Sequence, residues 1–297
     1  MNDGPAAPRE ALPAKVTVPQ IAAAKGVRPL VMVTAYDAPS ARAVDEGGAD
    51  IILVGDSLAM VVLGYDDTLR VDVEDMVRHT AAVSRTRPRA LVVADMPYLS
   101  YHTGTRDAVL AAGRLVREGG AEAVKLEGGR KRLEVIRALL DAEIPVMGHL
   151  GLTPQSLLAM GGYRVQARAV HEIETLLADA GALVEAGVFA LVLEGVPSDV
   201  AAMVTQRVAV PTIGIGAGPT CDGQVLVYHD LLGIHPGPAP RFVRRFGDLH
   251  TPAVAGVRAF ADEVRARTFP AMAESYRLPR ETAEALGRRP RARRREG

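Results

Sequence analysis

Eight short, largely apolar segments are the feature of this sequence that most limits how the chain can fold. They lie at residues 30–33, 51–54, 91–94, 123–126, 144–147, 189–193, 212–215 and 225–227. Segments that are apolar throughout, rather than alternating with polar residues, indicate strands buried on both faces, as in a parallel sheet covered by helices. Helical patterns fill most of the intervals between them. Alternating strands and helices predict an α/β fold.

One helical pattern and three similar segments refine this prediction. The apolar residues Ile173, Leu176, Leu177, Ala180, Leu183 and Val184 share one helical face that Gly187 would end, and Val254, Val257, Ala261 and Val264 form a second stripe. The segments EGGADIILVGD (46–56), EGGAEAVKLEG (118–128) and EAGVFALVLEG (185–195) repeat the order helix end, glycine, strand, acid. Eight strands favour a closed (β/α)₈ barrel, and no Gly-x-Gly-x-x-Gly follows the first strand, as a doubly wound dinucleotide fold would require.

The length of 297 residues permits either two domains or one barrel of about 250 residues. We predict a flexible arm at residues 1–17, a single (β/α)₈ barrel as the catalytic domain at 18–270, and a polar, Arg-rich tail at 271–297. The first residues lack the basic and apolar regions of a signal peptide, and no apolar run reaches the roughly 18 residues of a membrane span. Cys221 is the only cysteine, which excludes a disulfide scaffold and favours the cytoplasm.

The net charge of zero conceals a basic C-terminus. Lys and Arg number 35, as do Asp and Glu, but the last ten residues hold six arginines and one acid, so the remaining chain carries about five negative charges. Such a tail is typically solvated. With no Trp and 4% aromatic residues, the chain has little from which to build a base-stacking platform. We therefore expect neither a nucleic acid nor a membrane as partner.

Charged residues follow the predicted strands at their C-terminal ends, where barrel enzymes place catalytic groups. They are Asp56, Asp95, Lys125, Glu127, His149 and Glu194. Four carboxylates at one barrel mouth would repel one another, and a divalent cation would relieve that repulsion. Oxygen ligands without a His or Cys cluster favour magnesium over zinc. A single such acid could equally pair with Arg or Lys or cap a helix, but four on successive strands indicate a site.

The residue types alone leave the roles of several residues open. Lys125 could form a Schiff base if deprotonated, but neighbouring acids would keep it charged and suited to holding a substrate oxygen. His149 is as compatible with a structural role as with a catalytic one. The GIGAG segment at 214–218 could bind an anion or serve tight packing, and Cys221 lacks an evident base partner.

Longer motifs carry a resemblance to a known family. They are VTAYDAPSA (33–41), VGDSLAMVVLGYDDTL (54–69), HTAAV (79–83), VVADMPYLSY (92–101), AVKLEGG (123–129), PVMGHLGLTPQS (145–156), GGYRVQAR (161–168), LVLEGVP (191–197) and PTIGIGAGPTCDGQVLVYHD (211–230). The chain resembles the ketopantoate hydroxymethyltransferase (3-methyl-2-oxobutanoate hydroxymethyltransferase) family from about residue 18 to residue 270. Ala59 and Ala167 stand where that family often has Gly, and the Arg-rich tail replaces its usual acidic ending.

The resemblance implies a (β/α)₈ barrel that transfers a hydroxymethyl group from 5,10-methylenetetrahydrofolate to 3-methyl-2-oxobutanoate. The product would be 2-dehydropantoate, for pantothenate and coenzyme A biosynthesis. The resemblance further implies Mg²⁺ or a similar cation as cofactor, and a large ring-built homo-oligomer such as a decamer. By motif, Asp56, Asp95 and Glu127 resemble the metal site, and Glu194 the general base. The implied substrate-binding residues are Ser57, Asp95, Lys125 and His149.

The chemistry of the residues agrees with that implication. Removing a proton beside a ketone produces an enolate, so the enzyme needs a base and a group that stabilises an oxyanion. A magnesium-dependent α-keto acid lyase of the isocitrate lyase/phosphoenolpyruvate mutase type could use the same acids without folate. A barrel that only binds ligand or serves as a scaffold would be expected to lack one of the charges at the strand ends, and all of them are present.

Overall fold

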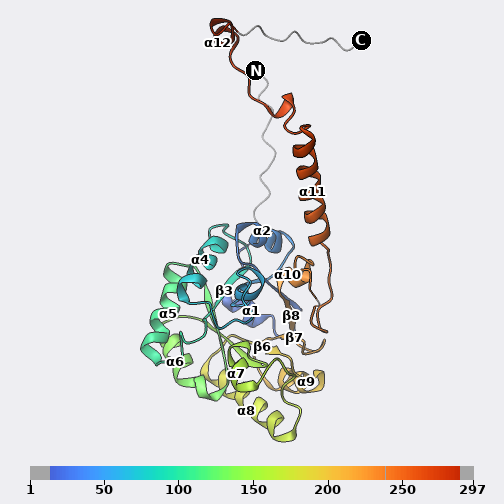
Figure 1. Ribbon diagram of the computed structural model, residues 1–297. Coiled ribbons are helices and arrows are strands. Elements are labelled where there is room, and N and C mark those ends of the chain that lie inside the picture. Colours follow the sequence, from blue (N-terminus) through green and yellow to red (C-terminus); the bar gives the residue numbers. More distant parts are fainter. Residues whose placement is uncertain (1–13, 238, 288–297) are drawn as a thin grey trace, which may run out of the picture. The chain divides into compact units, whose positions relative to one another are not determined.

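The computed structural model describes residues 14–237 and 239–287 and contains a closed barrel of eight parallel strands (Figure 1). The strands are β1 (Leu30–Thr34), β2 (Ile51–Val54), β3 (Leu91–Asp95), β4 (Ala123–Glu127), β5 (Val146–Gly151), β6 (Ala190–Glu194), β7 (Thr212–Ile215) and β8 (Gly223–Leu226). Each strand pairs with the next in sequence, and β8 closes the barrel on β1 with Leu30 opposite Gly223. The predicted (β/α)₈ barrel is confirmed.

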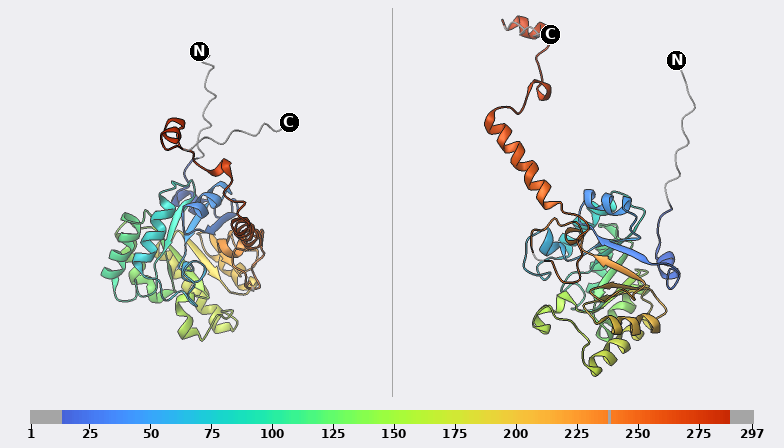
Figure 2. Two further views of the ribbon diagram at one scale, coloured as in Figure 1. Left: turned by 45° about the horizontal axis from the view of Figure 1, so that its top comes forward. Right: turned by 90° about the vertical axis from the view of Figure 1, so that its right-hand side faces the viewer.

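Helices surround these strands (Figure 2). They are α1 (Val18–Ala23), α2 (Ala38–Glu46), α3 (Leu58–Val61), α4 (Val73–Ser84), α5 (Thr105–Arg117), α6 (Leu133–Asp141), α7 (Leu157–Met160), α8 (Val170–Ala186), α9 (Ser198–Arg207) and α10 (Tyr228–Leu231), with 3₁₀ turns at Arg130–Arg132 and Pro154–Ser156. Local sequence sets their ends. The side chains of Asp37 and Asp72 accept hydrogen bonds from backbone amides in the first turns of α2 and α4, and Gly187 ends α8 in the left-handed conformation, as predicted.

Alternate residues of each strand supply two separate apolar cores. Ile51 and Leu53 of β2 face the barrel interior, whereas Ile52 and Val54 pack against the surrounding helices. The same alternation holds in the neighbouring strands, which explains why both faces of the strands are apolar. The charged residues at the strand ends therefore face inward or outward according to their parity.

The N-terminal end of the barrel is closed by the segment that precedes β1. Val16 and Ile21 are buried in the interior core, and the Val16 amide donates a hydrogen bond to the carbonyl of Arg89. At the same end, the Asp50 carboxylate accepts two hydrogen bonds from the Arg28 guanidinium, at 3.0 and 2.7 Å. The charged residues at the strand ends therefore lie at the opposite, C-terminal end of the barrel.

Several strand boundaries differ from the predicted ones, most of them by a single residue, and two strands differ by more. The fifth strand begins at Val146, because Pro145 precedes it without an amide hydrogen, and it continues to Gly151 through pairing with β6. The eighth strand spans 223–226 rather than 225–227. The chain divides into two compact units after Gly247. Most of the predicted arm and the last ten residues of the tail lie outside the described residues.

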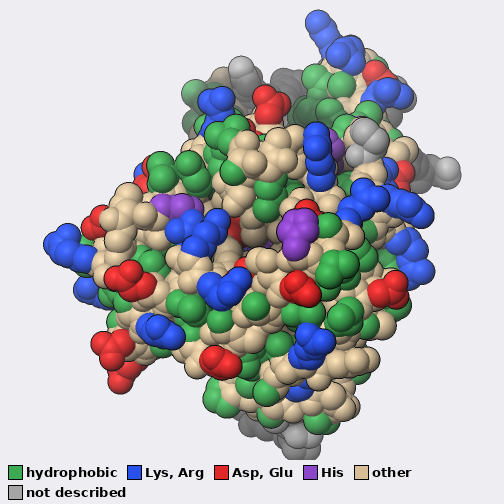
Figure 3. All heavy atoms as spheres, turned by 90° about the horizontal axis from the view of Figure 1, so that it is seen from below, with side chains coloured by type: hydrophobic (Ala, Val, Ile, Leu, Met, Phe, Trp, Pro, Cys, Tyr) green, Lys and Arg blue, Asp and Glu red, His purple; other side chains and the backbone are tan. Residues whose placement is uncertain are grey.

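The second unit, from Asp248, contains α11 (His250–Ala266), a 3₁₀ turn at Met272–Glu274 and α12 (Arg280–Ala285). The late apolar stripe lies on α11, as its spacing predicts, but no residue of this helix is buried. The stripe therefore does not belong to the core of the barrel. Among the described residues, no helix is both long and apolar enough to span a membrane. Acidic and basic side chains are interspersed on the face that Figure 3 shows.

Candidate active site

Inward-facing residues change from apolar to charged toward the C-terminal ends of the strands. In β4, Ala123 is the apolar inward-facing residue, and Lys125 and Glu127 occupy the next two inward positions. Asp95 continues the inward series of β3, His149 that of β5 and Glu194 that of β6. The alternation that builds the interior core therefore also directs five charged side chains to one barrel mouth.

Asp95 and Lys125 form a buried ion pair. Pairing of β3 with β4 places the two residues side by side, and Lys125 Nζ lies 2.7 Å from Asp95 Oδ1. Burial lowers the pKa of the Lys125 ammonium, but the charges of Asp95, Glu127 and Asp56 outweigh that effect and hold it above its ordinary value. Lys125 therefore remains a cation, which supports the prediction that it holds an oxygen rather than forming a Schiff base.

His149 lies between two carboxylates. Its Nδ1 is 3.3 Å from Glu127 Oε1, and its Nε2 is 3.3 Å from Glu194 Oε2. Burial and the charge of Lys125 oppose protonation of the ring, but the two carboxylates raise the His149 pKa to about 9. At neutral pH a protonated His149 would fix the positions of both acids.

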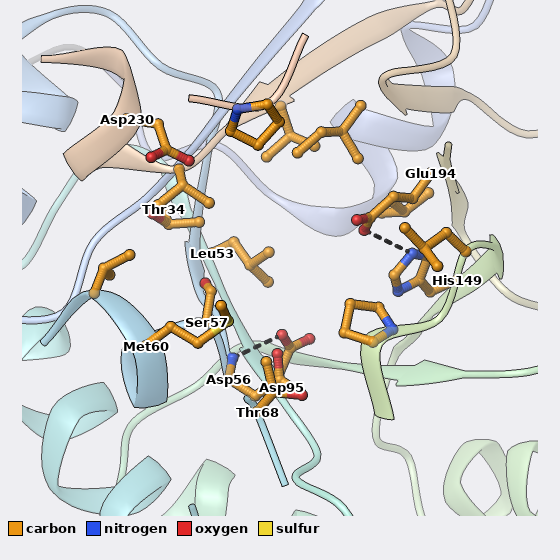
Figure 4. Close-up of a pocket in the computed structure, with 18 of the residues that line it drawn as sticks. Thr34, Leu53, Asp56, Ser57, Met60, Thr68, Asp95, His149, Glu194 and Asp230 are labelled. Atoms are coloured by element: carbon orange, nitrogen blue, oxygen red, sulfur yellow. Dashed lines mark hydrogen bonds and ion pairs between the residues drawn. The ribbon is translucent and has the colours of Figure 1, made fainter. Parts of the chain in front are cut away.

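Asp56 follows the end of β2 and is held against β3. Its backbone amide donates to Asp95 Oδ2 at 3.0 Å (Figure 4). Burial, together with the negative charges of Asp95 and Glu127, holds the pKa of the Asp56 carboxyl well above its usual range. An ionised Asp56 therefore requires further positive charge nearby.

Two further buried residues organise the acids, and the sequence analysis did not identify them. Gln155 donates from Nε2 to Asp56 Oδ2 at 2.8 Å, and its backbone amide donates to Glu127 Oε2 at 3.0 Å. The Tyr101 hydroxyl donates to Gln155 Oε1 at 2.5 Å and accepts from the Glu127 amide at 3.2 Å. Both residues fall within family motifs quoted above, VVADMPYLSY and PVMGHLGLTPQS. Their place in these motifs was the only feature of the sequence that could have marked them as site residues.

Ser57 lies at the same mouth but contacts a different group. Its Oγ is 2.9 Å from the hydroxyl of Tyr36, a buried residue in the loop after β1. This contact holds the Ser57 side chain beside the ionic cluster. Each of the two hydroxyls can still make further hydrogen bonds. Tyr36 is a second buried tyrosine that only its motif could have indicated.

All seven predicted site residues line one cavity of about 690 Å³, namely Asp56, Ser57, Asp95, Lys125, Glu127, His149 and Glu194. The structure thus brings the predicted residues together. The side chain of Glu194 is 17% exposed, whereas those of Asp95 and Glu127 are 3% exposed. Glu194 is therefore the more accessible to a small molecule inside the cavity (Figure 4).

The charges in the cavity fit a divalent cation. Its four carboxylates at the strand ends face two cations, Lys125 and His149, which leaves two negative charges when all are ionised. Among the described residues, no three His, Cys, Asp or Glu side chains form a ready ligand cage. Magnesium characteristically binds one or two carboxylates and completes its octahedron with water and substrate oxygens. Asp56 and Asp95, joined through one hydrogen bond, supply such a pair.

The glycines after β7 have packing partners. A Cβ added at Gly216 would lie 2.9 Å from the Phe242 ring, and one added at Gly214 would lie 3.0 Å from Cys221 Sγ. Gly216 and Gly218 have φ angles of +61° and +80°. These contacts account for the GIGAG segment through close packing and turn geometry.

Comparison with known proteins assigns the chain to a family. A sequence model of the ketopantoate hydroxymethyltransferase family matches residues 15–272. The chain belongs to this family. The 3-methyl-2-oxobutanoate hydroxymethyltransferase of Moorella thermoacetica is 57% identical over 265 residues, covering 89% of this chain and 98% of the relative. That of Koribacter versatilis is 55% identical over 258 residues, covering 87% and 88%. The resemblance drawn from the motifs is confirmed.

Solved structures related to the ketopantoate hydroxymethyltransferase barrel share its fold at low identity. A 2,3-dimethylmalate lyase of the PEP mutase/isocitrate lyase superfamily matches with a TM-score of 0.56 and 19% identity, over 90% of this chain and 92% of the lyase. A phosphonopyruvate hydrolase in complex with oxalate and Mg²⁺ gives 0.55 and 15%, over 91% and 95%. These likenesses support the barrel architecture alone.

Proposed function

We propose that the chain transfers a hydroxymethyl group from 5,10-methylenetetrahydrofolate to 3-methyl-2-oxobutanoate, giving 2-dehydropantoate for pantothenate and coenzyme A biosynthesis. One observation carries the proposal. In a member of the ketopantoate hydroxymethyltransferase family, the strand ends bring four carboxylates into one cavity with Lys125 and His149, and Glu194 is the most accessible of the four. Deprotonation next to a ketone needs such a combination of base and positive charge.

The keto acid would bind against the buried cation and the hydroxyl at the mouth. Lys125 keeps its proton and can donate to a substrate carboxylate or keto oxygen, while Ser57 Oγ can donate from the segment after β2, two strands away. Asp95 fixes Lys125 by their ion pair and so sets the position of the donated proton. Binding in a buried cavity excludes water and strengthens these charge interactions.

A magnesium ion would be held by Asp56 and Asp95, with Glu127 belonging to the same site directly or through water. Bound there, the ion would act as a Lewis acid toward the 2-oxo group of the substrate. Gln155 would keep one oxygen of Asp56 engaged through its 2.8 Å hydrogen bond and leave the other free. The chain's own contribution is thus to hold two carboxylates close together despite their repulsion.

Glu194 would take the proton from carbon 3 of the keto acid. His149 Nε2 lies 3.3 Å from Glu194 Oε2, so a protonated His149 can orient the base by its charge. The resulting carbanion forms a carbon–carbon bond to the methylene carbon of the folate, the two bonds from that carbon to the folate nitrogens N5 and N10 break, and these nitrogens take up the proton removed from carbon 3 and one proton of water. Water supplies the hydroxyl of the new hydroxymethyl group.

Proton exchange tests this assignment. We expect wild-type protein to exchange the C3 proton of 3-methyl-2-oxobutanoate in D₂O, followed by NMR, in the presence of magnesium and tetrahydrofolate. Glu194→Gln should abolish that exchange, and Glu185→Gln, on the exposed side of α8, should not change it. Absence of exchange in wild type under every condition would contradict the proposal and direct attention to lyase substrates.

We also propose that the chain assembles with copies of itself into a homo-oligomer such as a decamer. No residue of α11 is buried, although the helix is 17 residues long and carries Val257 and Phe260 exposed. A helix of that length is marginally stable in water without tertiary packing. Sedimentation velocity should give a mass several times the 31.4 kDa of one chain, and Phe260→Asp should lower it. A wild-type monomer would contradict this assembly.

A further inference from the structure

The cavity extends well beyond the ionic cluster. Its volume of about 690 Å³ lies in the range used by drug-sized ligands and exceeds what a five-carbon keto acid fills. The remaining lining comes from the segments after β2, β5 and β8, and it includes Tyr65, Tyr163, Asp230 and Phe242. A second, larger molecule can therefore occupy the cavity together with the keto acid.

Asp230 is the carboxylate of this second region. It lies in α10, directly after β8, and β8 stands four strands from β4, hence across the closed barrel from Lys125 and Glu127. Figure 4 shows it on the side of the cavity opposite Asp56 and Asp95. Among the described residues, its carboxylate makes no hydrogen bond or ion pair, although the side chain is partly buried and lines the cavity. Its acceptor oxygens are available to a ligand.

The environment of Asp230 raises the pKa of its carboxyl above the ordinary value. Burial raises the pKa of the Asp230 carboxyl, whereas His235, His229 and Arg245 act in the opposite direction. His229 packs against the ring of Tyr36, with centroids 5.5 Å apart, so its position is fixed from the barrel side. Ionised Asp230 is a directional acceptor for two adjacent N–H groups, as other carboxylates are for the fork of a guanidinium.

Flat side chains line the same cavity as this carboxylate. Phe242 and Tyr65 are 40% and 42% exposed and line the same cavity. Phe242 packs on Gly216, where a side chain would clash with its ring, and the chain that follows it returns to α10 through the hydrogen bond from the Phe246 amide to the Leu231 carbonyl. Phe242 is thus held in place in the cavity that Asp230 also lines, and an aromatic surface there suits a planar ring.

We propose that Asp230 binds the aminopyrimidinone ring of the one-carbon donor, accepting hydrogen bonds from its ring N–H and exocyclic amino group while Phe242 and Tyr65 contact the ring faces. The inference rests on the proposed function, since it takes the donor to be a tetrahydrofolate. It assigns the donor's ring to the β8 side of the cavity, across from the acids that serve the keto acid. The one-carbon unit would then lie between the two.

Binding measurements test the role of Asp230. We expect Asp230→Asn to weaken tetrahydrofolate binding by about 10- to 100-fold in isothermal titration calorimetry, because one hydrogen bond to a charged acceptor is lost and the new amide opposes the ligand's N–H groups. Asp199→Asn, which removes an exposed carboxylate of α9 that does not line the cavity, is the matched control and should leave the dissociation constant within about twofold.

An analogue of tetrahydrofolate without the 2-amino group identifies the contact itself. Wild-type protein should bind this analogue about tenfold more weakly than tetrahydrofolate, while Asp230→Asn should bind the two ligands almost equally. An equal loss in both proteins would overturn the proposal, as would unchanged tetrahydrofolate binding by Asp230→Asn. If wild type fails to bind tetrahydrofolate but still exchanges the keto acid proton, the Asp230 site fails and the chemistry assigned to Glu194 stands.

Discussion

Replacing Gln155 by leucine measures how strongly one buried amide stabilises the site. The Gln155 side chain makes three hydrogen bonds, donating to Asp56 Oδ2 at 2.8 Å and to the Met96 carbonyl at 2.9 Å, and accepting from the Tyr101 hydroxyl at 2.5 Å. Leucine is close to glutamine in size, so the substitution removes these bonds without opening a large cavity. The three partners would remain buried and unsatisfied.

The size of the effect follows from those partners. A hydrogen bond to an ionised carboxylate contributes about 1.5–3 kcal/mol, and one between neutral groups about 0.5–1.5 kcal/mol. For one bond of the first kind and two of the second, the free energy of unfolding should fall by about 3–5 kcal/mol. Magnesium affinity should also fall by about 10- to 100-fold, because Asp56 loses the group that orients it.

Urea denaturation followed by far-UV circular dichroism, at one protein concentration, gives the free energy of unfolding. Magnesium affinity is measured separately by calorimetry. Gln224→Leu is the matched control, since this exposed side chain of β8 makes one hydrogen bond, to the Gly218 carbonyl at 3.0 Å. Its cost should stay below about 1 kcal/mol. If Gln155→Leu destabilises no more than Gln224→Leu, the reasoning about this network is refuted.

Four other substitutions test the barrel. Burial alone would raise the pKa of the Asp50 carboxyl, but hydrogen bonds from the Arg28 guanidinium and the Val31 amide outweigh it, so the pKa lies below its ordinary value. The stabilisation from this ionised carboxylate is therefore present above the unfolded pKa of about 3.9 and is lost as pH falls through the folded value. Asp50→Asn should therefore cost about 1–3 kcal/mol at pH 7 in urea denaturation, and a difference from wild type that grew below pH 4 would contradict this sign. Gly151 has φ +96°, and an added Cβ would overlap the carbonyl of Glu194, so Gly151→Ala should cost about 2–4 kcal/mol and slow C3 proton exchange. Gly181→Ala, in α8 with open space around it, should instead raise stability by about 0.5–1 kcal/mol. Ala167 is buried at φ +53°, so Ala167→Gly should relieve strain and raise Tm by about 1–4 °C, and a lower Tm would show that its methyl packing matters more.

The strands could be predicted because each is both short and apolar, and because glycines or acids mark its ends. The fifth strand shows the limit of that signal. Its second half, Gly-His-Leu-Gly, lacks an apolar run and is a strand only because Gly148 and Gly151 pair with Leu191 and Glu194 of β6. Pairing partners more than forty residues away are not visible in a local pattern.

Some site residues could likewise be predicted from the sequence, and others could not. Asp95, Lys125 and Glu194 could be predicted because they stand at strand ends, where parity directs them inward. Gln155 and Asp230 lie in short helical turns after strands, where no periodicity relates a polar residue to the cavity. On α11, by contrast, the apolar period was correctly identified, but amphipathicity does not specify which surface a helix covers.

Closure of the barrel between β1 and β8 has a consequence during synthesis. The paired segments Leu30–Val33 and Gly223–Leu226 are separated by almost the whole barrel sequence, so the ring cannot form until residue 226 has left the ribosome. Until then a growing parallel sheet has one unpaired edge at β1 and another at its newest strand, and such edges promote aggregation. The acids on β2 to β6 are already synthesised by that time and repel one another within an open sheet. We therefore expect nascent chains stalled before β8 to depend on chaperones and full-length chains to be released from them.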